Sequence, residues 1–266
     1  MRGASLPRPV AARGSPGHAI LRAVTTDPGS NPDTVPAGGA RALVVAIDGP
    51  SSSGKSTVGA EAARRLHYRF CDTGLLYRAV AWLALERGVV PGEVARLVPL
   101  VAEVTLVADG RGRLRHVEAG GRDVTVEVSR AAVDRAVSEY AKVPELRAAL
   151  VGRQRAIAAD GGIIMAGRDI GTVILPDADV KIYLNASAEE RAIRRAEQRR
   201  ATDVAAVDQI LEDLRRRDSI DSSRETAPLR TAPDAVIINT DGNSFEQTVD
   251  AVMQAIREVQ GYKSGS

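Results

Sequence analysis

The chain has little of what stabilises or specialises a protein through disulfide or metal bonds. Cys71 is the only cysteine among 266 residues, which excludes an intrachain disulfide and indicates a reducing compartment, the cytoplasm. The three histidines, His18, His67 and His116, are scattered, so no zinc site is expected. Aromatic residues make up 3% of the chain and hydrophobic residues 44%, so we expect a sizeable aliphatic core.

Long apolar runs and a large excess of one charge are also missing. No stretch approaches the length of a transmembrane helix, so no membrane partner is expected. A formal net charge of +2 argues against a protein that coats nucleic acid. Residues 1–40 are rich in Pro, Gly, Ala and Arg without sustained periodicity, and arginines interrupt every candidate signal-peptide core. We interpret them as a disordered N-terminal extension, and residues 261–266 as a flexible tail.

What the chain does contain is a phosphate-binding pattern. Residues 49–56, GPSSSGKS, match G-x-x-x-x-G-K-[ST] at every fixed position. An apolar run at 42–47 predicts a buried strand before it, and 57–67 predicts a helix after it, which is the context that the motif requires. Glycines let backbone N–H groups converge on a phosphate, while Lys55 supplies charge to the β- and γ-phosphates and Ser56 a hydroxyl for Mg²⁺. The pattern therefore indicates a nucleoside triphosphate site rather than an ordinary turn.

The rest of the chain alternates between apolar strands and helical segments. Continuous apolar strands, such as those expected at 162–167, 180–184 and 235–239, predict an α/β fold with a parallel sheet of about five strands covered by helices on both faces. Between residues 104 and 126, three short stretches separated by Asp109-Gly110 and Gly120-Gly121 predict a small antiparallel meander. This meander interrupts the alternation, so we interpret residues 90–135 as an insert.

Two groups of charged residues share helical faces. The first consists of Arg191, Arg194 and Arg195, and the second of Arg217, Asp221 and Arg224. Like charges side by side repel unless an anion lies among them, and phosphoryl transfer between two phosphates needs such a counter-charge. The alternative is a solvated face with salt bridges to nearby acids, namely Glu189, Glu190, Asp213 and Asp218. The phosphate-binding loop favours the first interpretation.

Several motifs in order resemble the bacterial cytidylate kinases, a family of P-loop nucleoside monophosphate kinases. They are IDGP at 47–50, the loop itself, DTGLLYR at 72–78, RQR at 153–155, GRDIGT at 167–172, RD at 217–218 and APL at 227–229. The resemblance covers about residues 41–260. It implies a kinase core (41–89, 136–190 and 225–260), a nucleoside-monophosphate-binding insert at about 90–135 and a lid at about 191–224. It also implies that a monomer uses ATP and Mg²⁺ to phosphorylate CMP and dCMP.

The same resemblance implies a role for each matching residue. The ATP site would comprise Gly49, Pro50, Ser51, Ser52, Ser53, Gly54, Lys55, Ser56, Thr57 and Arg194, with Ser56 also a ligand of Mg²⁺. The acceptor site would comprise Thr73, Arg147, Asp169 and Arg224 for cytosine, Arg78 and Arg168 for the phosphate, and Ser138, Arg217 and Asp221 for the sugar. Lys55, Arg168, Arg191 and Arg195 would be catalytic. Ala166 departs from the family, which often has an acidic residue before Gly-Arg-Asp.

Elementary chemistry agrees with a cytosine site. A carboxylate such as Asp169 accepts a hydrogen bond from the cytosine amino group, whereas uracil has no donor there. Leaving a buried polar group unpaired costs ~1–3 kcal/mol, enough for about tenfold or more in preference. No general base is needed, because the acceptor phosphate is already ionised.

Three other functions fit parts of the sequence. The first is another P-loop small-molecule kinase, acting on UMP, AMP or shikimate, which the long insert and GRDIGT disfavour. The second is a P-loop NTP-binding switch or regulatory module; a GTP-dependent switch would need an Asn-Lys-x-Asp guanine motif, which the chain lacks. The third is a nucleic-acid-binding ATPase, which the near-neutral charge disfavours.

Overall fold

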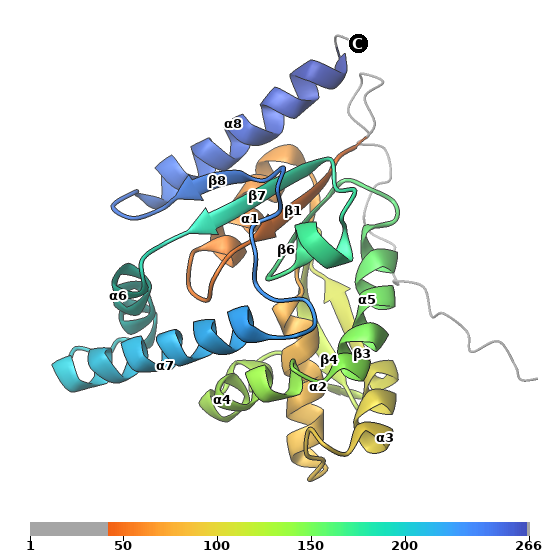
Figure 1. Cartoon of the computed structure of the whole chain (residues 1–266). Helices are drawn as coiled ribbons and strands as arrows, with labels where there is room; N and C mark the ends of the chain where they lie inside the picture. Colours follow the sequence, from red (N-terminus) through yellow and green to blue (C-terminus); the bar gives the residue numbers. More distant parts are fainter. Residues whose placement is uncertain (1–41, 265–266) are drawn as a thin grey trace, which may run out of the picture.

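The structure is a computed structural model that describes residues 42–264, and Figure 1 shows how their elements are arranged. The N-terminal extension expected over residues 1–40 lies outside the described residues, as do residues 265 and 266 of the expected tail. The beginning of that tail, residues 261–264, continues the last helix, α8 (Phe245–Ser264).

One sheet forms the centre of the described part of the chain. Its strand order is β3-β4-β2-β6-β1-β7-β8, with β5 paired to β4. Five neighbouring strands are parallel, as the alternation of strands and helices predicts. They are β2 (Arg69–Asp72), β6 (Ile163–Gly167), β1 (Val44–Asp48), β7 (Val180–Asn185) and β8 (Val236–Asn239). All five residues of β6 are buried, which explains why this strand is apolar throughout.

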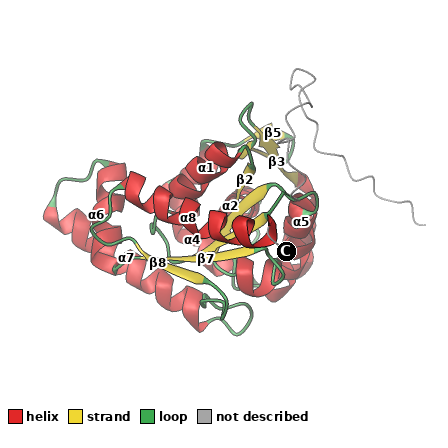
Figure 2. Cartoon of the chain, turned by 90° about the horizontal axis from the view of Figure 1, so that it is seen from above, coloured by secondary structure: helices red, strands yellow, loops and turns green. Residues whose placement is uncertain are grey.

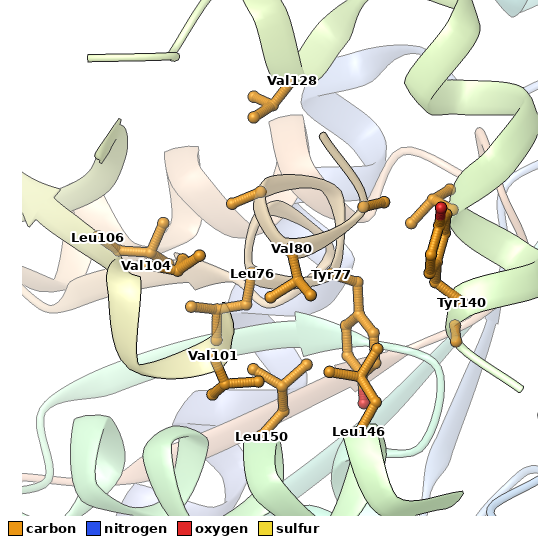
Figure 3. Close-up of a cluster of buried hydrophobic side chains, with 14 of the residues drawn as sticks. Leu76, Tyr77, Val80, Val101, Val104, Leu106, Val128, Tyr140, Leu146 and Leu150 are labelled. Carbon is orange, nitrogen blue, oxygen red and sulfur yellow. The ribbon is translucent and has the colours of Figure 1, made fainter. Parts of the chain in front are cut away.

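Helices cover both faces of the sheet, and alternate residues of each strand meet different helices. Val45 and Ile47 of β1 pack in the cluster that contains α1 (Lys55–Leu66) and α8. Ala46 points the other way, into the cluster that contains α2 (Gly74–Glu86) and α5 (Pro144–Ala158). Figure 3 shows this second cluster, where Leu76 and Val80 of α2 approach Leu146 and Leu150 of α5. The predicted two-layer covering of the sheet is confirmed.

The meander expected in the insert is present and joins the main sheet. Its strands β3 (Val104–Ala108), β4 (Arg113–Ala119) and β5 (Arg122–Asp123) pair antiparallel, as predicted. In addition, β4 pairs parallel with β2 through Phe70 and Cys71, which extends the central sheet. Before the meander, α3 (Val94–Leu97) is followed by a 3₁₀ segment, η1 (Val98–Glu103). Pro99 lacks the N–H that an uninterrupted α-helix would use there.

The expected lid region lies in two helices that pack on each other. These are α6 (Ala188–Arg199) and α7 (Val204–Ser223), held together by a small apolar cluster of Ala192, Ala196, Ile210 and Leu214. Figures 1 and 2 show the pair extending to one side of the sheet. In Figure 1, α4 (Ala131–Tyr140) lies next to α7. Within residues 42–264, every helix is too short or too polar to span a bilayer.

Asp48, the last residue of β1, ties the phosphate-binding loop to the segment after β6. Its carboxylate accepts hydrogen bonds from the backbone N–H groups of Ile170 and Gly171, at 2.8 and 2.7 Å. These residues begin a short π-helical turn, η3 (Ile170–Ile174), which directly follows Arg168 and Asp169. Burial raises the pKa of Asp48 to about 6, although the two N–H groups oppose this shift.

We expect this buried carboxyl to leave a pH signature in stability. The folded protein takes up a proton on Asp48 near pH 6, whereas an unfolded aspartate does so near 3.8, so protonation favours the folded state. The unfolding free energy of the wild type, relative to Asp48→Asn, should therefore rise by about 1 kcal/mol between pH 7 and pH 5. Urea denaturation of both proteins across this range measures the difference, and a difference that stays flat or falls would contradict the assignment.

Candidate active site

The carboxyl ends of β1, β2 and β6 meet at one edge of the sheet, where ligands bind in open α/β folds. A cleft of about 550 Å³ lies at this edge. It brings together most of the residues predicted for the two substrates: Ser51, Ser52, Gly54, Lys55, Ser56, Thr57, Thr73, Arg78, Ser138, Arg147, Arg168, Asp169, Arg194, Arg195, Arg217, Asp221 and Arg224. Four predicted residues do not line it, namely Gly49, Pro50, Ser53 and Arg191.

The phosphate-binding loop has the backbone conformation that its glycines permit. Gly49 has φ +149°, and a Cβ there would lie 2.2 Å from the carbonyl oxygen of Leu184, so no other residue fits. Gly54 has φ +93° and precedes the first residue of α1. The loop therefore ends at a helix N-terminus, whose free N–H groups and dipole favour an anion.

Lys55 is buried at the floor of the loop and is held by the loop itself. Its ammonium donates to the carbonyl of Pro50 at 2.6 Å and to the hydroxyl of Ser53 at 3.2 Å. This explains why Pro50 and Ser53 lie behind the cleft rather than in its lining. Burial, and after it the neighbouring Arg168, lower the pKa of Lys55 well below its ordinary range. A polyanion bound at the loop would reverse this effect, because it would favour the charged ammonium.

Ser56 and Asp72 place two oxygen ligands beside the loop. The Ser56 hydroxyl donates to the Asp72 carboxylate at 2.5 Å, and both residues line the cleft. Mg²⁺ in nucleotide sites is bound by one or two such oxygens together with substrate phosphates. Among the described residues, no group of three or more His, Cys, Asp or Glu side chains is placed to hold a metal ion by itself. The residues present thus fit Mg²⁺. Asp72 was not among the predicted ligands, although it stands just before Thr73.

A buried ion pair lies at the other end of the cleft. Arg147, on α5, donates to the carboxylate of Asp169, and both side chains are less than a tenth exposed. The guanidinium of Arg147 also lies over the ring of Tyr77, 5.5 Å from its centre.

Thr73 donates its hydroxyl to the carbonyl of Ala166 at 2.9 Å. The Ala166 methyl group is buried in the core under the α1 face of the sheet.

Asp221 joins two of the predicted acceptor-site arginines. Its carboxylate, 1% exposed, accepts from Arg168 at 2.8 Å and from Arg224. Burial alone would raise the pKa of Asp221, but Arg168, Arg224 and Arg217 together hold it below its usual range. The Arg168–Asp221 pair thus connects the loop after β6 with the end of α7.

The three arginines of α6 that were predicted as site residues have different surroundings. Arg194 pairs with Glu190 and also donates to Thr240. Arg191 pairs with Asp218 at 2.6 Å and donates to the carbonyl of Ser51 at 3.1 Å, which ties α6 to the phosphate-binding loop. Salt bridges to nearby acids therefore do form for two of these arginines, as the alternative interpretation predicts. The third arginine, Arg195, lines the cleft and instead pairs with a residue on α4.

That residue, Asp134, is the main omission from the sequence-based site. Its carboxylate accepts hydrogen bonds from Arg78, Arg195, Arg199 and Arg217. Asp134 lies four residues before the predicted site residue Ser138, on the same face of α4, and this spacing could have indicated it from the sequence. The arginines that bind it could not be inferred from spacing, because they come from three other helices.

Comparisons with known proteins show which family this chain is similar to. A family model described as Cytidylate kinase matches residues 45–258. The cytidylate kinase of Geobacillus kaustophilus is 45% identical over 82% of this chain and 98% of its own length. That of Nocardia farcinica is 44% identical over 81% and 94%. Among solved structures, a shikimate kinase from Acinetobacter baumannii in complex with shikimate is 15% identical over 82% of this chain and 94% of its own, with a TM-score of 0.40.

The phosphate-binding loop, the Gly-Arg-Asp segment and Arg217 of α7 lie around one cleft, inside the region that the family model covers. Relatives above 40% identity align along almost their whole length with residues that include both ends of this cleft. The resemblance seen in the sequence is thereby confirmed: this chain belongs to the cytidylate kinase family.

Proposed function

We propose that the protein transfers the γ-phosphoryl group of ATP to CMP or dCMP, and that the cleft at the carboxyl edge of the sheet is the site of transfer. The observation that carries this proposal is the meeting of two chemistries in one cleft. A phosphate-binding loop lies at one end, and a buried Arg147–Asp169 pair suited to a cytosine edge lies at the other. Cytidylate kinase activity needs both: a nucleoside triphosphate as donor and a cytidine monophosphate as acceptor.

The loop would hold ATP through its backbone N–H groups and Lys55. The Ser56 hydroxyl and the Asp72 carboxylate would hold Mg²⁺, which when bound neutralises charge on the donor phosphates. All three guanidinium nitrogens of Arg191 donate, to Ser51, to Asp218 and to the carbonyls before α6, so besides its proposed catalytic charge Arg191 would hold α6 against the loop. Arg194 is held by Glu190 and Thr240 and lines the cleft.

The acceptor would bind between α2, α5 and α7. Asp169 accepts from the cytosine amino group and Arg147 donates to the ring, while Thr73 and Arg224 complete the base site. Arg78 and Arg168 hold the phosphate, and Ser138, Arg217 and Asp221 contact the sugar. Catalysis then comes from alignment and from arginine charge near the transferred group, with Arg168 and Arg195 beside Lys55. We further propose that a cytoplasmic monomer suffices, since one chain supplies both ends of the cleft.

The direct test measures ADP formation from ATP and Mg²⁺ with CMP, dCMP, UMP, AMP or no acceptor. We expect fast turnover with CMP and dCMP and slow turnover with the others. Uracil has a carbonyl oxygen where cytosine offers its amino group to Asp169, and the purine of AMP places its amino group on a larger, differently shaped base. Equal rates with AMP, or without an acceptor, would refute the proposed function.

Replacement of Lys55 tests the donor end. Lys55→Ala removes the only ammonium at the loop, so we expect kcat with CMP to fall about 100-fold or more. Circular dichroism should show an intact fold. The matched control is Lys142→Ala, whose ammonium pairs with Glu139 on the surface and whose loss should leave kcat unchanged. Normal turnover by Lys55→Ala would contradict the role of this residue.

Replacement of Asp169 tests base recognition. The amide of Asp169→Asn no longer offers two acceptors, so we expect kcat/KM for CMP to fall by ~10- to 100-fold and the preference over UMP to shrink. Asp160→Asn, at the opposite end of β6, is the matched control and should keep both values. If Asp169→Asn keeps the wild-type ratio of CMP to UMP turnover, the carboxylate does not read the base.

A further inference from the structure

Four arginines from three helices converge on one carboxylate beside the cleft. Asp134 accepts hydrogen bonds at one oxygen from Arg78 at 2.7 Å and from Arg217 at 3.2 Å. At its other oxygen it accepts from Arg195 at 2.6 Å and from Arg199 at 2.8 Å. We call this group the Asp134 cluster. It connects α2, α6 and α7 through a single residue of α4.

The carboxylate of the Asp134 cluster stays ionised. The Asp134 side chain is 12% exposed, and this burial alone would raise its pKa. Arg78, Arg195 and Arg217 together outweigh that effect and hold the pKa of Asp134 well below its usual range. A permanent negative charge therefore contacts three arginines that line the cleft proposed to bind two phosphates, and its presence there calls for an explanation.

The geometry leaves the arginines able to bind phosphate at the same time. Each guanidinium donates to Asp134 through a single nitrogen, although it carries five N–H groups. Arg78, Arg195 and Arg217 also line the cleft. The Nε of Arg217 is buried with no hydrogen-bond acceptor among the described residues. Four positive charges against one negative charge leave a surplus of three, so the cluster still attracts phosphate.

Without Asp134 the cluster would repel itself. Neighbouring guanidiniums, chiefly Arg168 and Arg78, already lower the pKa of the buried Arg217 to about 10, after the larger effect of burial. Arg78 lies on the acceptor side of the cleft, whereas Arg195 lies on the proposed lid. Only a shared anion keeps these side chains at one point before the substrates arrive.

We infer that Asp134 is a positioning residue, which holds Arg78, Arg195 and Arg217 together so that the acceptor end of the cleft and the lid are aligned for phosphoryl transfer. This inference rests on the proposed function. It assigns Asp134 no contact with the reacting atoms. Its effect passes through the arginines, and most of all through Arg195, which links α6 to α4.

The first experiment compares steady-state kinetics of Asp134→Asn, Asp134→Glu and the wild type with ATP and CMP. We expect Asp134→Asn to lower kcat ~10- to 100-fold, with a smaller rise in KM for CMP, and Asp134→Glu to recover part of the loss. Glu139→Gln is the matched control, because it removes an exposed carboxylate from the same helix, and it should behave as the wild type. If Asp134→Asn lowers KM for CMP and leaves kcat unchanged or higher, the carboxylate competes with phosphate and the inference is overturned.

The second experiment is a double-mutant cycle with Arg195→Gln. If Asp134 acts by placing Arg195, the loss of Arg195 costs much less kcat in the Asp134→Asn background than in the wild type. If the fold-losses in kcat of the two single variants multiply in the double variant, Asp134 and Arg195 contribute independently, and the inference is overturned. Thermal unfolding verifies that each variant folds, and if Asp134→Asn does not, Asp134→Glu takes its place in the cycle with the same two outcomes. A wild type that forms no ADP with CMP would refute the proposed function instead.

Discussion

The two hydrogen bonds from Ile170 and Gly171 to Asp48 constrain the whole active-site edge. Asp48 immediately precedes the glycine that opens the phosphate-binding loop, while the two N–H groups immediately follow Arg168 and Asp169. The carboxylate thus sets the position of the phosphate-binding loop, the proposed donor end, relative to Arg168 and Asp169 of the proposed acceptor end. Its burial is costly, as the raised pKa shows, and the backbone donors are what make a charge tolerable there. A Cβ on Gly171 would lie 3.2 Å from Lys181, so this turn has little room to shift.

Elsewhere in the cleft, arginines are paired with buried carboxylates. Arg147 faces Asp169, Asp221 lies between Arg168 and Arg224, and the Asp134 cluster stands beside the lid. Such pairs satisfy arginines that would otherwise be buried alone, and they leave a net positive surplus for phosphate. Preorganisation of this kind costs stability in the free protein and lowers the reorganisation needed when both substrates bind.

The local parts of the site could be predicted from the sequence, and the long-range parts could not. The loop around Lys55 and the order of strands and helices follow from spacing within a few residues. The Asp134 cluster depends on packing between α2, α4, α6 and α7, and no periodicity in one helix reveals it. The β2–β4 pairing likewise joins distant segments, and it makes the meander part of the main sheet. The contact of Arg191 with the Ser51 carbonyl was equally hidden, because Ser51 approaches α6 only in the fold, whereas Asp218 was among the acids that the alternative interpretation named.

The central claim is that one cleft holds a donor triphosphate and an acceptor monophosphate at once. Titration calorimetry with an inhibitor that joins adenosine to cytidine through a chain of phosphates tests it most directly. The account predicts one molecule bound per chain, far more tightly than ATP or CMP alone, with affinity lost in both Lys55→Ala and Arg78→Ala. Binding no tighter than that of ATP, or binding that Arg78→Ala leaves unchanged, would contradict the account.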